Sequence, residues 1–323
     1  MSDKIVLLVS PGEHGRFAIQ EQTVSEPGEG QILIRHQAIG TNFLDVYHRK
    51  GIYPLPTNPA VIGAEAAGVV EAVGSGVWDF REGDRVAYAG PPVGAYASLR
   101  LIAAERVVKL PDSISMKTAA SSLLKGMTAQ MLLEKTYKVG AGDVVLVHAA
   151  AGGLGTILTR GAKARGAVVI GTVGSEEKAV LARAAGADHL LVGRDADLIS
   201  EVKALTDGNG VDVAYDGIGG NTLLKSLHSV RPFGIAVTIG QAAGPIPPVA
   251  VENLRPGKFL AHPSIMAWCA DVDGYRETAT AALRDIEAGI VAQVDSEYRL
   301  EEVAAAHARM ETGRSSGSIL LMP

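Results

Sequence analysis

The sequence has 323 residues, of which 47% are hydrophobic and 20% are charged, a profile that indicates a globular protein with a large core. This length exceeds the size at which a single core stops growing, so we expect two domains. The net charge of −5 argues against nucleic-acid binding as the main role. The single cysteine, Cys269, excludes an internal disulfide and a structural zinc site built from cysteines.

The sequence carries no signal that would send the protein to a membrane. Its N-terminus, Met-Ser-Asp-Lys-Ile, lacks the pattern of a signal peptide. No apolar run reaches the length that spans a bilayer. We therefore expect a cytoplasmic protein with no membrane partner.

The first 120 residues favour β-structure. Short runs of apolar, often β-branched residues lie between clusters of Gly, Pro, Asp and Asn. The expected strands cover residues 4–10, 31–38, 66–73, 84–88, 93–100 and 105–111. Several short strands at close spacing predict a small, strongly bent barrel.

From residue 115 the pattern becomes helical and then alternates between strands and helices. Two helices rich in Ala, Leu and Met are expected over 116–124 and 127–135. Strands are then expected to begin at residue 143 and to cover 167–173, 189–192, 211–216 and 234–240, with helices over 176–185, 196–206 and 221–230. This order predicts the α/β class with a doubly wound parallel sheet. The last part of the chain adds a helix over 275–288 and a strand over 318–322.

A glycine-rich turn follows the first strand of this alternation. It consists of Ala150, Ala151, Gly152, Gly153, Leu154 and Gly155. It departs from the pattern G-x-G-x-x-G in that Ala150 replaces the first glycine. In that pattern Gly152 lets the backbone approach a pyrophosphate, and Gly155 lets the helix pack against the strand. We expect a dinucleotide here; the alternative is a flavodoxin-like domain whose glycine-rich turn binds no nucleotide.

Six segments carry a resemblance that spans nearly the whole chain. They are AIGTNFLDVYHRKGIYP at 38–54, PAVIGAEAAGVV at 59–70, KGMTAQ at 125–130, AAAGGLG at 149–155, GTVGSEEK at 171–178 and YDGIGG at 215–220. In this order they resemble the quinone oxidoreductase branch, the zeta-crystallin-like group, of the medium-chain dehydrogenase/reductase superfamily. The resemblance implies a GroES-like, barrel-containing catalytic domain over residues 1–124. It also implies an inserted Rossmann domain over 125–264 and a return segment of the catalytic domain over 265–323.

The resemblance bears on metal chemistry, because alcohol dehydrogenases of the superfamily polarise the substrate oxygen with zinc. In register with their ligand Cys this chain has Asn42, and in place of the His of their Gly-His-Glu it has Ala64 before Glu65. The eight His residues show no metal-ligand spacing. We therefore expect no metal. Oxidation of an alcohol requires a group that binds and deprotonates the hydroxyl, whereas reduction of an electrophilic acceptor depends less on such a group.

The end of the second Rossmann strand predicts the cofactor. NAD-preferring domains place an acid there, on the ribose 2′-hydroxyl, whereas this chain has Gly174. Glu176 and Glu177 fit better as first-turn residues of a helix capped by Ser175. The resemblance implies that Ser175 and Lys178 meet a 2′-phosphate, so we expect NADPH; the alternative is that Lys178 is an ordinary solvated residue.

Further cofactor contacts are implied by the resemblance. Thr128 is similar to the family residue beside the nicotinamide ribose. Gly240 and Gln241 follow the last strand of the alternation, at the sheet edge where ligands bind in open α/β folds; a plain glycine-rich loop is the alternative. Arg194 is expected to contribute to binding of the adenosine phosphate, although the tyrosine that many relatives have before it is Gly193 here.

The resemblance also implies an acceptor pocket lined by Asn42, Asp45, Tyr47 and Tyr53, with His262 on the far side of the cleft. Hydride arrival leaves an oxyanion on the acceptor, and we assign its stabilisation to Tyr47 and Asn42. Tyr53 is expected to form a wall, and Asp45 to orient its neighbours. Two alternatives remain: the tyrosines are rim residues without a chemical role, or a quinone takes its protons from water.

The sequence thus predicts NADPH-dependent, zinc-independent reduction of quinones by direct hydride transfer. One alternative is a reductase of α,β-unsaturated carbonyls, since both acceptor types take a hydride at an electron-poor conjugated centre. Another is a non-catalytic, crystallin-like NADPH-binding protein, or one that also binds RNA. The acidic net charge argues against RNA binding. The segment KFLAH at 258–262 resembles a family strand that pairs across a two-fold axis, so we expect a homodimer.

Overall fold

The computed structural model describes residues 3–323, and the chain divides into two compact units. The barrel unit contains the chain up to Met127 together with Ile265–Pro323, and the parallel-sheet unit contains Thr128–Ser264. The N-terminal and C-terminal parts of the chain therefore belong to one unit, and the other is inserted between them.

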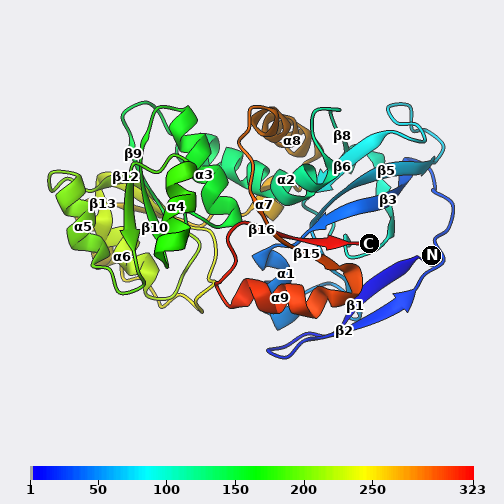
Figure 1. The fold of residues 1–323 in the computed structure, drawn as a ribbon, viewed down its shortest axis with the longest axis horizontal. Helices are drawn as coiled ribbons and strands as arrows, with labels where there is room; N and C mark the ends of the chain where they lie inside the picture. Colours follow the sequence, from blue (N-terminus) through cyan, green and yellow to red (C-terminus); the bar gives the residue numbers. More distant parts are fainter. Residues whose placement is uncertain (1–2) are drawn as a thin grey trace. The chain divides into compact units, whose positions relative to one another are not determined.

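The parallel-sheet unit is built on six strands in the order β11-β10-β9-β12-β13-β14; β9, β10, β12 and β13 are labelled in Figure 1. The strands are β9 (Val144–Val147), β10 (Val168–Val173), β11 (His189–Val192), β12 (Val211–Asp216), β13 (Val230–Thr238) and β14 (Phe259–Ala261). Every pairing is parallel. With β9 taken as the first strand this is the order 3-2-1-4-5-6 of a dinucleotide-binding Rossmann fold, which confirms the predicted class.

The helices of this unit follow the predicted alternation. They are α3 (Gly153–Ala164), α4 (Glu176–Ala184), α5 (Leu198–Leu205) and α6 (Thr222–Ser229), with a 3₁₀ turn at Val251–Leu254. The core contains fully buried Leu146 and Ile170 from the central strands and Val202 and Leu227 from the covering helices. Strands buried on both faces explain the continuous apolar runs of the sequence.

The barrel unit contains two sheets, in which the strand pairs are antiparallel except for the parallel pair β15 and β16. One sheet has the order β2-β1-β4, and the larger has the order β15-β16-β3-β5-β6-β8, with β7 paired to β3. The strands are β1 (Lys4–Ser10), β2 (Arg16–Glu21), β3 (Gln31–Gly40), β4 (Ala60–Val61), β5 (Glu65–Val73), β6 (Arg85–Ala89), β7 (Leu99–Ala103), β8 (Val108–Lys109), β15 (Val294–Arg299) and β16 (Ser318–Met322). The return segment thus adds two strands to the larger sheet, of which only β16 was predicted.

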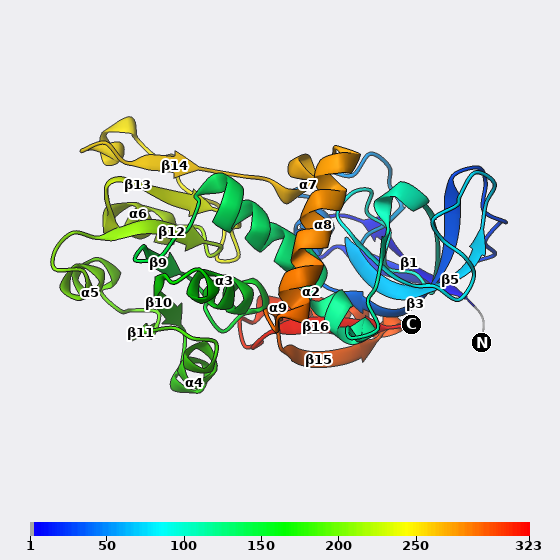
Figure 2. The ribbon, with the colours of Figure 1, turned by 90° about the horizontal axis from the view of Figure 1, so that it is seen from above.

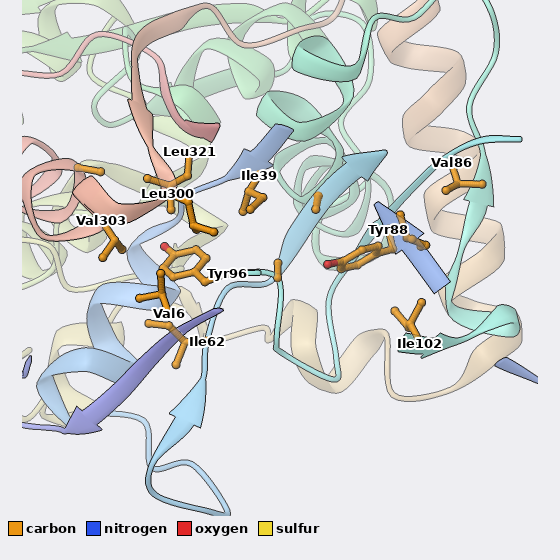
Figure 3. Close-up of a cluster of buried hydrophobic side chains, with 14 of the residues drawn as sticks. Val6, Ile39, Ile62, Val86, Tyr88, Tyr96, Ile102, Leu300, Val303 and Leu321 are labelled. Carbon is orange, nitrogen blue, oxygen red and sulfur yellow. The ribbon is translucent and has the colours of Figure 1, made fainter. Parts of the chain in front are cut away.

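The largest side-chain cluster of the barrel unit joins distant parts of the chain. Tyr96 has no exposed surface and packs with Val6, Ile62 and Leu300 (Figure 3). Val303 brings α9 (Val303–Glu311) into the same cluster. The N-terminal strands and the C-terminal helix are therefore held by one core.

Two predicted strands of the barrel unit were wrong in extent. Residues 93–98 are not a strand; β7 begins at Leu99, because Gly94 adopts φ 141° and the backbone at 94–96 instead bonds to Gly63 and Ile62. Over 105–111 only β8 is a strand, since Ala104–Arg106 forms a 3₁₀ turn.

The helices of the barrel unit are α1 (Phe43–Lys50), α7 (Ile265–Trp268), α8 (Val272–Glu287) and α9, with a 3₁₀ turn at Leu300–Glu302. Helix α2 (Met116–Gln130) begins in this unit, and its last residues belong to the parallel-sheet unit. The predicted break near Gly126 was wrong, because α2 is continuous and is extended by a π-helix at Met131–Thr136. A Cβ on Gly126 would lie 3.2 Å from the Cβ of Ala282 in α8. The glycine thus serves close helix packing, which Figure 2 shows for α2 and α8.

Two glycines of the parallel-sheet unit allow a matched stability test. A Cβ on Gly155 would clash with the backbone carbonyl of Ala149, whereas a Cβ on Gly174 would meet nothing within 4 Å. We expect Gly155→Ala to lower the free energy of unfolding by about 1–3 kcal/mol or more, and Gly174→Ala to change it by less than about 0.5 kcal/mol. Urea unfolding of both variants measures this, and equal effects would contradict the packing role of Gly155.

Candidate functional site

The glycine-rich turn lies where parallel strands end, at the carboxyl edge of the sheet. Helix α3 begins at Gly153 with Gly152 as its N-cap, and no side chain caps it. Its first N–H groups therefore have no intrahelical partner, and they form an anion site of the kind that binds a pyrophosphate. A Cβ on Gly152 would stand 3.1 Å from the Ala149 carbonyl, so this close backbone turn suits glycine. The turn fits a dinucleotide.

A buried polar network that sequence reasoning missed fixes this edge of the sheet. Asp216 ends β12 with no exposed surface, and its Oδ1 accepts the N–H groups of Ile218 (2.8 Å) and Gly219 (3.0 Å). Its Oδ2 accepts the hydroxyl of Ser226 at 2.7 Å. These bonds fix the loop after β12. The loop after β13 is joined to it, because the Ala243 N–H donates to the Ile218 carbonyl at 2.8 Å.

The network continues through His148, which directly follows β9. Its Nε2 lies 2.8 Å from Ser226 Oγ, and its Nδ1 lies 3.1 Å from Thr172 Oγ1. Because the Ser226 proton goes to Asp216, Nε2 donates and Nδ1 accepts; burial lowers the pKa of His148 and favours this neutral form. The signal was present in the sequence: His148, Thr172 and Asp216 are polar residues at the ends of buried strands.

The segment predicted to select the cofactor has the expected local structure. Helix α4 begins at Glu176, and its N-cap Ser175 accepts the backbone N–H of Lys178 at 3.4 Å, which confirms the predicted cap. The Ser175 hydroxyl also lowers the pKa of Glu177. Gly174, exposed at the end of β10, has open space beside it, so this position can accommodate a phosphate without a clash.

The remaining predicted cofactor residues lie at the following places. Thr128 is in the last turns of α2, Arg194 is exposed just after β11, and Gly240 and Gln241 follow β13. His262 is exposed just after β14. All five belong to the parallel-sheet unit, and their predicted roles stay predictions.

The predicted acceptor residues gather on α1, a helix that the sequence prediction missed. Asn42 is its N-cap, and the Asn42 backbone N–H bonds to the Asp45 carboxylate at 2.8 Å. Gly51 ends the helix at φ 75°. An Asn followed three residues later by an acid, with a glycine past the end, is a helix signature that could have been read from the sequence.

Asp45 is buried in a polar chain inside the core. Its Oδ2 also accepts the hydroxyl of Tyr96 at 2.9 Å, while its Oδ1 has no partner. Tyr96 in turn lies 2.9 Å from Nε2 of His307, which must donate because the tyrosine proton is used on Asp45. Burial raises the pKa of Asp45 to about 7, against the opposing effect of these hydrogen bonds.

Tyr47 and Tyr53 lie together near the end of α1. Their rings meet edge to face with centroids 5.3 Å apart, and Tyr47 is only 6% exposed. His48 supports them, because its Nδ1 donates to the Tyr53 carbonyl at 2.9 Å. The structure therefore brings Asn42, Asp45, Tyr47 and Tyr53 onto one short segment, and their chemical roles stay predictions.

A second buried carboxylate, Glu65 at the start of β5, connects α1 to α2. Its Oε1 accepts both Asn42 Nδ2 and Lys125 Nζ, each at 2.9 Å. Its Oε2 accepts the backbone N–H of Leu124 at 2.8 Å. Glu65 is therefore both an ion-pair partner and a hydrogen-bond acceptor.

Residues 3–323 contain no group of three or more His, Cys, Asp or Glu side chains placed to hold a metal ion. No helix in this described range is long and apolar enough to cross a bilayer.

Two family models match the chain. Residues 28–112 match the alcohol dehydrogenase GroES-like domain, and residues 153–266 match a model described as zinc-binding dehydrogenase. The second description names zinc, whereas Asn42 and Ala64 stand where the zinc enzymes of the superfamily have ligands.

Known proteins resemble the chain over nearly its whole length. The 2-haloacrylate reductase of a Burkholderia species is 43% identical over 97% of this chain and 96% of its own length. Quinone oxidoreductase 1 of Escherichia coli is 38% identical, with 94% of each chain covered. The crystal structure of the Escherichia coli quinone oxidoreductase complexed with NADPH superimposes with a TM-score of 0.93 at 37% identity, covering 99% of this chain and 100% of that one.

The buried Asp45 carboxyl should make the free energy of unfolding depend on pH. Its folded pKa of about 7 lies above the unfolded value of 3.8, so its contribution is present at low pH and is lost as the pH rises through 7. Relative to Asp45→Asn, the wild-type free energy of unfolding should therefore fall by a few kcal/mol between pH 4 and pH 8, since one pKa unit is about 1.4 kcal/mol.

Urea unfolding at several pH values measures this difference. The exposed Asp79→Asn is the control, and its difference from wild type should not vary with pH. A pH-independent difference for Asp45→Asn as well would show that Asp45 is ionised in the folded protein throughout this range.

Proposed function

Because this chain belongs to the quinone oxidoreductase branch of the medium-chain dehydrogenase/reductase superfamily, we propose that it reduces quinones with NADPH. It is an oxidoreductase, as its relatives are. The observation that carries the cofactor half of the proposal is the end of β10, where Gly174 leaves open space in place of a ribose-binding acid.

The cofactor is NADPH, which is bound in the similar Escherichia coli structure. The N–H groups at the start of α3 suit its pyrophosphate, and we assign its 2′-phosphate to Ser175 and Lys178 at the start of α4. When bound, NADPH supplies a hydride. Thr128, Arg194, Gly240 and Gln241 complete the proposed set of contacts.

The chain's own residues must then place the acceptor and meet the charge that develops on it. A quinone that takes a hydride and one proton becomes a hydroquinone, and an enone takes the hydride on its β-carbon and the proton on its α-carbon. In both cases negative charge develops on the carbonyl oxygen. We assign hydrogen bonds to that oxygen to Tyr47 and Asn42, with Asp45 orienting α1 and Tyr53 forming a wall.

One relative favours a second candidate. The 43% identity to a 2-haloacrylate reductase is at least as high as the identity to the quinone oxidoreductases. Reduction of a 2-haloacrylate also adds a hydride to an electron-poor double bond. The alternative function is therefore an NADPH-dependent reductase of α,β-unsaturated carbonyl or carboxyl compounds.

We also propose that the protein is a homodimer formed through β14. This strand is at the edge of the parallel sheet (Figure 2), and it exposes Phe259 (55%) and Leu260 (36%). An exposed apolar edge strand invites pairing with a second copy. Light scattering should give twice the chain mass of 33.5 kDa; the monomer mass at micromolar concentration would exclude the dimer.

A steady-state panel of quinones, alkenals and 2-haloacrylates, each with NADPH and with NADH, tests the function. We expect quinones to give the highest kcat/KM, and NADPH to be preferred by roughly tenfold or more, the value of one charge-assisted bond to phosphate. Turnover confined to alkenals or 2-haloacrylates would establish the second candidate. Tight NADPH binding without turnover of any acceptor would favour a non-catalytic, crystallin-like role.

A further inference from the structure

Three segments far apart in the sequence meet at the carboxylate of Glu65. Asn42 comes from the start of α1, Glu65 from the start of β5, and Lys125 from the middle of α2. Glu65 has no exposed surface and Lys125 is 9% exposed. Both the Asn42 amide and the Lys125 ammonium donate to the same oxygen, Oε1, at 2.9 Å.

This geometry fixes the orientation of the Asn42 side chain. A carboxylate only accepts hydrogen bonds, so it selects the amide orientation in which Nδ2 faces Glu65. One N–H of Asn42 is used in this way, and the second N–H remains available as a donor. The orientation therefore depends on where this carboxylate oxygen lies.

Lys125 holds the Glu65 carboxylate in place. Its ammonium lies 2.9 Å from Oε1, the same oxygen that accepts the Asn42 amide. A buried carboxylate that loses its cationic partner is strongly destabilised, so the position of Oε1 depends on this ion pair. The ammonium of Lys125 thus fixes the acceptor that orients the Asn42 amide.

We propose that Lys125 is a positioning residue for reduction: acting through Glu65, it holds the Asn42 amide in the orientation that donates a hydrogen bond to the acceptor's carbonyl oxygen. This inference rests on the proposed function, because it takes the acceptor to be a compound that develops negative charge on that oxygen. It adds a residue of α2, outside the pocket residues, to the determinants of turnover.

Two variants separate positioning from simple charge balance. Lys125→Met leaves a buried carboxylate unpaired, so we expect a lower Tm and a kcat reduced roughly tenfold or more, up to the ~10²–10³ that loss of one oxyanion donor costs. Adding Glu65→Gln removes the buried charge, so the double variant should recover most of the lost Tm. Its kcat should stay low, because the introduced glutamine has one oxygen, which the Leu124 N–H retains, and turns its amide nitrogen toward Asn42.

Asn42→Ala tests whether the effect passes through Asn42. If it does, Lys125→Met should lower kcat in the wild type but not further in the Asn42→Ala background. The NADPH dissociation constant should change less than about threefold throughout. Lys117→Met is the matched control, since Lys117 lies on the same helix but pairs with Glu297 at the surface; it should leave Tm and kcat near wild type.

A readout without turnover completes the test. The side-chain amide signal of Asn42, identified by its loss in Asn42→Ala, should shift in the ¹H–¹⁵N spectrum of Lys125→Met and of the double variant, but not of Lys117→Met. An unshifted signal, or recovery of kcat together with Tm in the double variant, would overturn the inference. If the wild type turned over no acceptor, the proposed function would fail, while the amide signal would still decide whether Lys125 orients Asn42.

Discussion

Glu65 is a carboxylate with no exposed surface, so the barrel unit must supply its hydrogen-bond donors. These are the Asn42 amide, the Lys125 ammonium and the Leu124 backbone N–H. A buried charge with one partner removed costs more than most single contacts contribute. The pairing therefore specifies how α1, β5 and α2 meet, and it does so without a metal ligand at the position of Asn42.

Most of the parallel-sheet unit could be predicted from the sequence, because its strands are buried on both faces and appear as uninterrupted apolar runs. β11 and β12 have the predicted bounds. The barrel unit was harder to predict, because tertiary contacts determine more of its backbone conformation than the local sequence pattern does. The backbone at Gly94 bonds to Gly63, far back in the chain, and the break predicted at Gly126 is instead a contact with α8.

The candidate site was predictable only in part, for the same reason. Residue types and a family resemblance led to Asn42, Asp45 and the glycine-rich turn. The partners that hold such residues come from distant segments: Tyr96 and His307 behind Asp45, and Ser226 and His148 around Asp216. No spacing in one sequence encodes which buried polar groups meet. Most buried polar groups are hydrogen-bonded, but the identity of each partner follows only from the fold.

In both units, buried polar networks hold the segments that carry the proposed chemistry. Under the proposed function, the reaction needs only NADPH and an acceptor. Deuterium transfer tests this most directly. Protein freed of metal by chelation is given NADPH deuterated at its transferable position, with an alkenal as the acceptor in ordinary water. We predict one deuterium on the β-carbon of the product and a rate equal to that of untreated protein. Product without deuterium, or activity that returns only when zinc is added, would contradict the account.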